Sequence, residues 1–328
     1  MTEASEEPQR DVHLGTRIVR FPSEELQKMQ DSNHFLGDPD MLHRELHDKG
    51  YLLIRNFHDR QDVIGAKLAV LQHIRKCGVS LQADGWRDGV MRKTCGIDNV
   101  PFMEGRNDIT HSEELKRVFE GERPYKFFRE FLGCNARTFD FKWLRAVPRD
   151  TFTGVHVDNV YMGRGTKHLY TLWTPIGDIP AEMGVVAVCE GSHRLPGFQI
   201  LQDTYGSLDV ETSRLKGTGW FTTDPFEITR RFGGKWKVFD FKAGDVLIFG
   251  MRTVHMSTTN KTEFLRLSCD TRWQSADKPA DPRYIGNFKN PDPRFGLYGE
   301  EIKCEEEETT MDELRIKWGF DEKPPVTI

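Results

Sequence analysis

The stretch that decides the fold of this 328-residue chain is T-F-T-G-V-H-V-D, residues 151–158. On an extended segment, side chains two positions apart point to the same side, so His156 and Asp158 are expected to face one small object together. About a hundred residues later the apolar run G-D-V-L-I-F-G predicts a buried strand, and His255 follows it in M-R-T-V-H. Two imidazoles and one carboxylate are therefore candidate ligands of a metal ion.

A set of two histidines and one carboxylate is typical of non-haem Fe(II) oxygenases, which bind the metal on one face and leave the opposite positions open. Zinc is more often held by cysteine, or by three or four protein ligands in a tetrahedron. The H-x-D pattern alone also occurs by chance, and a lone histidine is usually a packed or surface residue. The pattern by itself leaves the structural interpretation open.

Arg266 strengthens the functional interpretation. It lies eleven residues after His255, in H-M-S-T-T-N-K-T-E-F-L-R. The intervening T-T-N-K-T is turn-like, which predicts that His255 ends one strand and that Arg266 lies on the next, antiparallel to it. A planar guanidinium that is always charged suits bidentate binding of a carboxylate. An arginine paired with a surface acid is the alternative, and the neighbouring triad favours carboxylate binding.

Five segments together resemble the phytanoyl-CoA dioxygenase family of Fe(II)- and 2-oxoglutarate-dependent oxygenases. They are, in chain order, G-V-H-V-D-N, L-Y-T-L-W-T-P-I-G-D, G-V-V-A-V-C-E-G-S-H-R, A-G-D-V-L-I-F-G and R-T-V-H-M-S-T-T-N, the last followed by Arg266. The resemblance runs from about His47 to Trp273. It implies Fe(II) as cofactor, 2-oxoglutarate and O₂ as cosubstrates, and hydroxylation of a C–H bond with release of succinate and CO₂.

The resemblance also implies the metal ligands, which are His156, Asp158 and His255. Halogenating relatives lack the carboxylate at the position of Asp158 and use the vacancy for chloride. The presence of Asp158 therefore favours hydroxylation over halogenation.

Four further residues are implied as contacts of the cosubstrate. Arg266 matches the residue that holds the distal carboxylate of 2-oxoglutarate, and Ser257 matches a position that helps to hold the same carboxylate. Trp173 matches an aromatic position that lines the same pocket. Arg145 stands where relatives often carry a cosubstrate-binding lysine.

Composition and charge exclude several classes of protein. The 22 Phe and 7 Trp supply enough apolar area for a sizeable core, so the chain is not disordered. A formal net charge of -5 gives no support for a nucleic-acid partner bound through its phosphates. The six cysteines are scattered without a C-x-x-C pair, which favours reduced thiols over disulfides or a zinc site.

The chain carries no recognisable targeting or membrane signal. Its start, M-T-E-A-S-E-E-P-Q-R-D, is acidic, no apolar stretch approaches the length that spans a bilayer, and the final P-P-V-T-I is not a peroxisomal address. We expect a cytoplasmic protein with no membrane partner.

The predicted fold is mainly β with flanking helices: a double-stranded β-helix, the jelly-roll of cupin-like proteins, with an N-terminal helical layer. Helical patterns around 40–77 and 111–132 come first, and short strand patterns fill 137–273. We expect a single oxygenase domain over 1–328. Its parts are an N-terminal extension (1–39), a helical buttress (40–135), a jelly-roll core (136–275) with a lid insertion (195–235), and a C-terminal extension (276–328).

Some alternatives stay open at this stage. His193 in G-S-H is a rival metal ligand, although a structural role at a strand end is favoured. A cupin-like protein that binds a small molecule or metal without turnover is the second hypothesis, and a zinc hydrolase would need a general base that the motifs do not provide. The substrate is expected to be a small molecule. An anionic group on it would match the basic residues of the insertion, which are Arg214, Lys216, Arg230 and Arg231. No motif in the sequence sets an oligomeric state.

Overall fold

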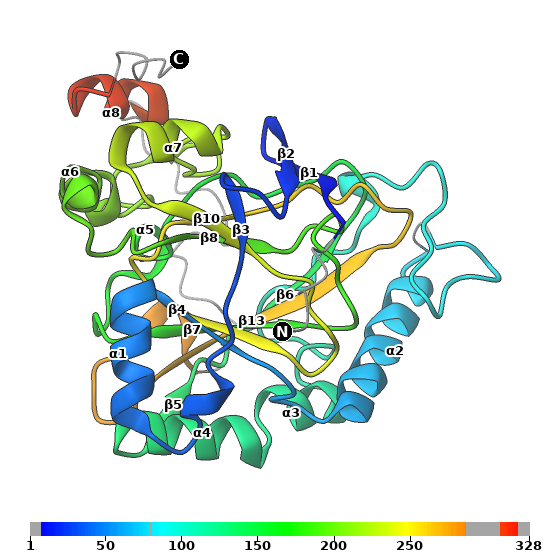
Figure 1. The fold of residues 1–328 in the computed structure, drawn as a ribbon. Coiled ribbons are helices and arrows are strands. Elements are labelled where there is room, and N and C mark those ends of the chain that lie inside the picture. The colour runs from blue at the N-terminus through cyan, green and yellow to red at the C-terminus, as the bar shows by residue number, and fades with distance from the viewer. Residues whose placement is uncertain (1–7, 79–80, 287–308, 321–328) are drawn as a thin grey trace, which may run out of the picture.

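Two β-sheets face each other at the centre of the molecule (Figure 1). The structure is a computed structural model that describes residues 8–78, 81–286 and 309–320. The larger sheet has the order β4 (Tyr51–Ile54), β11 (Val246–Gly250), β7 (Tyr170–Pro175), β13 (Arg266–Ser275) and β5 (Ala136–Thr138), with β6 (Trp143–Val147) also paired to β13. The smaller sheet has the order β12 (His255–Ser257), β8 (Val186–Glu190), β10 (Lys235–Val238) and β3 (Leu26–Lys28). Every pair of strands in the two sheets is antiparallel except the parallel pair β10 and β3.

Strand β11 explains why the sequence around it is continuously apolar. Leu247 and Phe249 belong to the core between the two sheets, whereas Val246 and Ile248 belong to the core under the helices. Because both faces of the strand are covered, no position can be polar without a buried partner. The predicted buried strand ahead of His255 is confirmed.

Helices cover the outer face of the larger sheet (Figure 1). They are α1 (Pro39–Lys49), α2 (Arg60–Lys76), α3 (Glu113–Phe119) and α4 (Glu122–Leu132). The ends of α1 follow from its sequence, since the Asp38 carboxylate accepts a hydrogen bond from the Met41 N–H and Gly50 ends the helix at φ 86°. The aromatic face of α4 lies on β13, where Phe128 stacks on Trp273 with ring centroids 4.6 Å apart.

The first described residues form strands. Strands β1 (Arg10–Leu14) and β2 (Arg17–Phe21) make a hairpin, and β3 then joins the smaller sheet beside β10. Residues 1–7 of the expected N-terminal extension lie outside the described residues. The segment expected as an N-terminal extension thus supplies one strand of the smaller sheet.

The 195–235 segment packs into the molecule, and the last described residues pack onto it. It contains α6 (Gln199–Asp203), β9 (Leu215–Lys216) and α7 (Pro225–Phe232). The C-terminal elements are β14 (Thr309–Thr310), which pairs with β9, and α8 (Met311–Lys317). Phe320 follows α8 and contacts Phe221 and Phe232 edge-on. In Figure 1, α7 and α8 lie on the side of the smaller sheet. A lid function for this segment stays a prediction.

The remaining elements are short. They are α5 (Asn159–Met162) and five 3₁₀ turns: η1 (Asn33–Phe35), η2 (Ile97–Asn99), η3 (Pro196–Phe198), η4 (Tyr205–Ser207) and η5 (Pro282–Tyr284). None of the helices in the described ranges has both the length and the apolar surface needed to cross a membrane. The predicted fold class, a jelly-roll core with an N-terminal helical layer, is confirmed by the two facing sheets and by α1 to α4.

Candidate metal centre

His156 and His255 meet through their backbones. The His156 N–H donates to the His255 carbonyl at 2.9 Å, and the His255 N–H donates to the His156 carbonyl at 3.0 Å. This reciprocal pair is one rung of an antiparallel ladder, so the two side chains leave the backbone next to each other. Their ring centroids lie 4.1 Å apart. The fold therefore brings together two histidines that are far apart in the sequence.

The hydrogen bonds of the two rings fix which nitrogen is available for a ligand. Nδ1 of His156 lies 2.8 Å from the Gly154 carbonyl, and Nδ1 of His255 lies 2.9 Å from the Thr253 carbonyl. A carbonyl only accepts, so each Nδ1 carries the proton and donates. Each Nε2 is left with its lone pair, the arrangement in which a neutral imidazole binds a metal.

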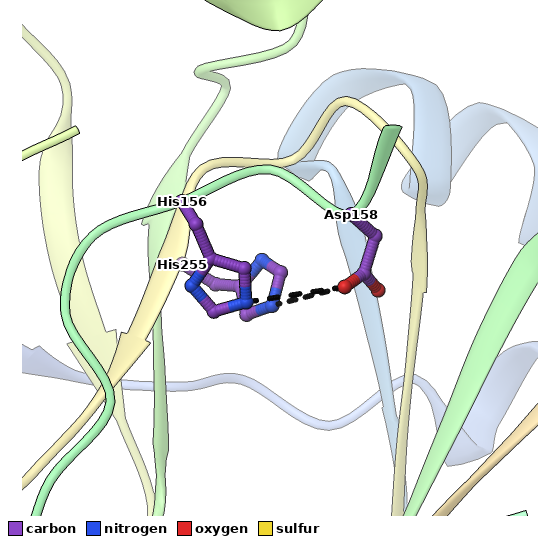
Figure 2. Close-up of side chains that lie close together, drawn as sticks. All are labelled: His156, Asp158 and His255. Carbon is purple, nitrogen blue, oxygen red and sulfur yellow. Dashed lines mark ion pairs between the residues drawn. The ribbon is translucent and has the colours of Figure 1, made fainter. Parts of the chain in front are cut away.

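Asp158 completes the group (Figure 2). Its Oδ1 lies 3.9 Å from Nε2 of His156 and 3.8 Å from Nε2 of His255. One ligand atom from each of the three residues lies within 4.8 Å of the others, and all three residues are buried. The backbone of Asp158 is helical, at φ -63° and ψ -26°, because it begins α5. A turn, and not a continuous strand, therefore aims this carboxylate at the two imidazoles.

The second oxygen of Asp158 is held by the larger sheet. Oδ2 accepts a hydrogen bond from the Thr171 hydroxyl at 2.7 Å and lies 3.2 Å from Nη2 of Arg272. Burial alone would raise the pKa of Asp158, but the charge of Arg272, followed by the two histidines, holds that pKa well below its usual value. Asp158 is therefore ionised at neutral pH.

Both imidazoles are neutral at neutral pH. Burial, and then the proximity of His255, lowers the pKa of His156 to about 3. Burial also lowers the pKa of His255. Metal binding requires neutral imidazole and ionised carboxylate, and these are the states that the site imposes before any metal arrives. Two imidazole nitrogens and one carboxylate oxygen suit a divalent transition metal such as Fe(II).

Arg266 is a buried cation that forms no ion pair with any acid in the described part of the chain. Its side chain begins β13, is 3% exposed, and donates from Nη1 to the Ser268 hydroxyl. Its Nε is buried without a hydrogen-bond partner, and no carboxylate in the part of the chain that the structure describes forms an ion pair with it. Burial, and then repulsion from Arg145, lowers the pKa of Arg266 to about 9, so it stays charged at neutral pH. A buried, unpaired guanidinium is costly unless an anion joins it.

Arg266 lies on the strand that follows the one with His255, as predicted, but His255 begins its strand and does not end it, and the two strands do not pair. β12 carries His255 and pairs with β8 in the smaller sheet, whereas β13 carries Arg266 and pairs with β5, β6 and β7 in the larger one. The intervening segment crosses between the sheets. Asn260 holds it in place, because its side-chain amide donates to the carbonyls of Val147 and Phe264. The segment T-T-N-K-T thus connects a strand of the smaller sheet to a strand of the larger sheet.

The other three predicted residues lie on three strands, one in the smaller sheet and two in the larger sheet. Ser257 follows His255 by two positions on β12, and its Oγ accepts from the Thr153 N–H at 2.8 Å. Trp173 on β7 is opposite Asp270 in register and is 2% exposed. Arg145 on β6 donates to Glu104 at 2.8 Å and to Asp270 at 2.7 Å. The guanidinium of Arg145 is thus held between two carboxylates, and the cosubstrate roles of all three residues stay predictions.

Sequence reasoning missed Thr171, Asp270 and Arg272. The signal was present on β13, where R-L-S-C-D-T-R-W-Q alternates polar and less polar residues, yet every position is buried. Leu267, Cys269 and Trp273 pack under the helices. The polar positions between them point to the opposite face of the sheet, toward Asp158. A strand that alternates in this way and is covered on both sides indicates a buried polar site.

The rival ligand is elsewhere. Nε2 of His193 lies 2.8 Å from the His47 carbonyl, at the end of α1. Within the described ranges, His156, Asp158 and His255 form the one group of three or more His, Cys, Asp or Glu residues with ligand atoms close enough for a metal. The structural role favoured for His193 agrees with this placement.

Comparisons with known proteins identify a matching family and similar solved structures. A family model described as phytanoyl-CoA dioxygenase (PhyH) matches residues 46–268, more than half of the chain. The structure of EctD from S. alaskensis with 2-oxoglutarate and 5-hydroxyectoine is similar at 16% identity and a TM-score of 0.53, over 94% of this chain and 98% of that one. The epimerase SnoN in complex with Fe3+, alpha ketoglutarate and nogalamycin RO is similar at 19% identity and a TM-score of 0.52, over 76% and 87%. A search of curated proteins finds no match. At these identities the two structures speak for the fold.

Proposed function

The chain belongs to the phytanoyl-CoA dioxygenase family, and on that premise we propose that it is an Fe(II)- and 2-oxoglutarate-dependent dioxygenase that hydroxylates a small organic molecule. The observation that carries the proposal is the convergence of two bare Nε2 atoms and one carboxylate oxygen in a buried site. Three protein ligands on one side leave room for two further ligands, which a bidentate ketoacid and O₂ require.

The residues divide into two groups by task. His156, Asp158 and His255 would hold the metal, and when bound, ferrous iron supplies O₂ activation coupled to decarboxylation of 2-oxoglutarate. Arg266 would neutralise the distal carboxylate of the cosubstrate, because its buried charge lacks an acidic partner within the described chain. The Ser257 hydroxyl would donate a hydrogen bond to the same carboxylate.

Hydroxylation is the reaction we propose within this class. Asp158 occupies the position that a halogenating site would leave vacant. The similar structures include one complex with a hydroxylated compound and one epimerase, so the test must separate the outcomes. Hydroxylation adds one oxygen atom from O₂ to the product, whereas epimerisation leaves the product mass unchanged.

The substrate is proposed to be a small molecule, and an anionic group on it remains a prediction. Two of the insertion's cations are already engaged, because Arg231 pairs with Glu227 at 3.2 Å and Arg230 lies over the Phe226 ring. The partners of both residues lie on α7 itself.

The direct test measures 2-oxoglutarate turnover without a known substrate. Protein loaded with Fe(II) should convert 2-oxoglutarate slowly to succinate in air, and addition of a true substrate from a panel should accelerate the conversion. His156→Ala protein, prepared in parallel, is the control and should form no succinate above free Fe(II). A protein that binds the metal and 2-oxoglutarate but forms no succinate with any substrate would support the non-catalytic alternative instead.

A further inference from the structure

We propose that Arg272 and Thr171 act as positioning residues that hold the outer oxygen of Asp158, so that Oδ1 alone faces the metal and a coordination position stays open for the cosubstrate. The inference rests on the proposed function and assigns roles to two residues to which the sequence analysis gave none.

The two residues grip the same atom from one rung of the sheet. Thr171 on β7 and Arg272 on β13 are direct partners in the antiparallel register. Both are almost fully buried, at 0% and 1% exposure. The Thr171 hydroxyl donates to Oδ2 of Asp158 at 2.7 Å, and Nη2 of Arg272 lies 3.2 Å from the same oxygen. Oδ1 is left facing the two imidazoles.

Arg272 is itself fixed in place. Its guanidinium lies 4.5 Å from the centroid of the Trp143 ring, and its Nε donates to Sδ of Met162 at 3.0 Å. Oδ2 of Asp270, two positions earlier on β13, lies 3.8 Å from Nη2 of Arg272, and Arg145 binds the same oxygen at 2.7 Å. An arginine stacked on an aromatic ring and flanked by a carboxylate cannot rotate away without losing several contacts.

The consequence for the metal concerns the number of positions that Asp158 occupies. A carboxylate can bind a metal through one oxygen or through both. When Oδ2 is committed to a hydroxyl and a guanidinium, it is not available as a second ligand. Without them, Oδ2 would compete for the position that the ketoacid needs, and the carboxylate would also lose its preferred orientation. Loss of such outer partners commonly weakens metal affinity 10- to 100-fold.

The test uses Co(II), whose visible spectrum reports the number and geometry of its ligands, in the full-length protein without cosubstrate. We expect Arg272→Met to weaken Co(II) binding about 10- to 100-fold and to change the spectrum. Thr171→Val removes one donor without changing the shape of the side chain, so its effect should have the same direction and be smaller. Arg272→Lys, which keeps the charge, should recover part of the affinity. Binding of 2-oxoglutarate to the Co(II) protein should also weaken in Arg272→Met.

A matched control separates positioning from general stability. Arg55 resembles Arg272 in that it lies 5.0 Å from the Phe239 ring centroid and pairs with the buried Asp245 at 3.0 Å, but it contacts no metal-ligand candidate. Arg55→Met should leave the Co(II) affinity and spectrum unchanged even if it lowers the unfolding temperature.

The outcomes that overturn the inference are defined for both variants. A folded Arg272→Met protein that binds Co(II) and 2-oxoglutarate like the wild type, with the same spectrum, would exclude the positioning role. If Arg272→Met does not fold, Thr171→Val decides, and wild-type behaviour of that variant would exclude the role. Failure of the wild type itself to bind Co(II) would instead remove the proposed function on which the inference rests.

Discussion

Arg266 shows how one residue can be arranged for a ligand at a cost to the free protein. Its guanidinium is buried, its Nε has no hydrogen-bond partner, and no acid within the described residues forms an ion pair with it, although Asp270 acts on it from further away. A structural arginine at this depth would be expected to have a carboxylate partner, as Arg283 has in Asp281 at 2.6 Å. The absence of such a partner within the described residues is what an anion-binding role requires.

Replacement of Arg266 by alanine should therefore weaken the use of 2-oxoglutarate. A charge-assisted hydrogen bond contributes on the order of 1.5–3 kcal/mol, so the KM for 2-oxoglutarate should rise roughly 10- to 150-fold. We expect 2-oxoglutarate to raise the melting temperature of the metal-loaded wild type, and this rise should disappear in Arg266→Ala. Arg266→Lys is the control that keeps a positive charge, and its KM for 2-oxoglutarate should lie between the values of the wild type and Arg266→Ala. An unchanged KM in Arg266→Ala would remove this residue from the site.

A second prediction at the residue scale concerns acid stability. Burial, and then the charge of Arg123, lowers the pKa of His58 to about 3, against about 6.5 in the unfolded chain. Between these values the unfolded chain binds a proton that the folded protein does not. The free energy of unfolding should therefore fall as pH falls from 6.5 toward 3, by up to about 1.4 kcal/mol per pH unit from this group.

Urea unfolding at pH 7 and pH 5 checks this sign. The metal-free wild type should lose stability at pH 5, and His58→Gln should lose less, because one of the groups that drive the loss is gone. His156 and His255 act in the same direction, so part of the pH dependence should remain. An equal loss in both proteins would show that His58 titrates normally in the folded state.

At the residue scale, the candidate metal ligands could be chosen from the sequence, but the residues that hold those ligands in position could not. The H-x-D pair and His255 could be chosen because their residue types and order carry the chemistry. The contacts of Arg272 and Thr171 with Asp158 could not be predicted, because they depend on the register between β7 and β13. The alternation along β13 indicates only that its polar side chains share one buried face.

At the scale of elements, the contact between α4 and β13 supports the site from behind. Phe128 is fully buried and stacks on Trp273, and the neighbouring position on β13 is Arg272, which faces the metal centre. The helix thus stabilises the strand that carries Arg266, Asp270 and Arg272. Loss of packing on the helix-covered face of β13 is therefore expected to disturb the residues on its opposite face, which lies toward the metal centre.

Phe128→Ala should lower the free energy of unfolding by about 3–5 kcal/mol, the usual cost of emptying a buried phenylalanine site. Phe128→Leu should cost less, because it fills part of the space. Chemical denaturation of both variants measures the difference. A cost below about 1 kcal/mol for the alanine variant would mean that α4 contributes little to β13.

Local signals define some elements, whereas pairing decides others. The N-cap Asp38 and the left-handed Gly50 delimit α1, and the predicted apolar run before His255 is β11. The short β3 was missed because three residues, L-Q-K, give no periodic pattern. The strands that carry His255 and Arg266 are consecutive as predicted but lie in different sheets, because a turn-like composition does not tell which sheet receives the next strand.

At the scale of the whole molecule, the last described residues connect to the metal centre through the 195–235 segment. Arg315 on α8 donates to the Phe221 carbonyl and to Glu227 on α7, and Phe320 packs against Phe221. The Phe221 N–H donates in turn to the Val155 carbonyl, next to His156. A continuous set of contacts therefore runs from the described C-terminal elements to a metal-ligand candidate.

Phe320→Ala should loosen this connection. Amide hydrogen exchange should accelerate at Phe221 and Val155, because the aromatic contacts that hold the segment are lost, while exchange within β13 should stay as in the wild type. The exposed Ile316 on α8 provides a matched control, since Ile316→Ala removes apolar surface that is 61% exposed and should change neither region. Unchanged exchange at Phe221 in Phe320→Ala would mean that this contact does not hold the segment.

The central claim is that His156, Asp158 and His255 bind Fe(II) together with 2-oxoglutarate. Anaerobic titration of Fe(II) and 2-oxoglutarate tests it most directly, because a ketoacid chelated to ferrous iron gives a visible charge-transfer absorption that neither component gives alone. The wild type should show this absorption at one equivalent of metal, and His156→Ala, folded as judged by circular dichroism, should not. No absorption in the wild type, or the same absorption in the variant, would contradict the assignment of the site.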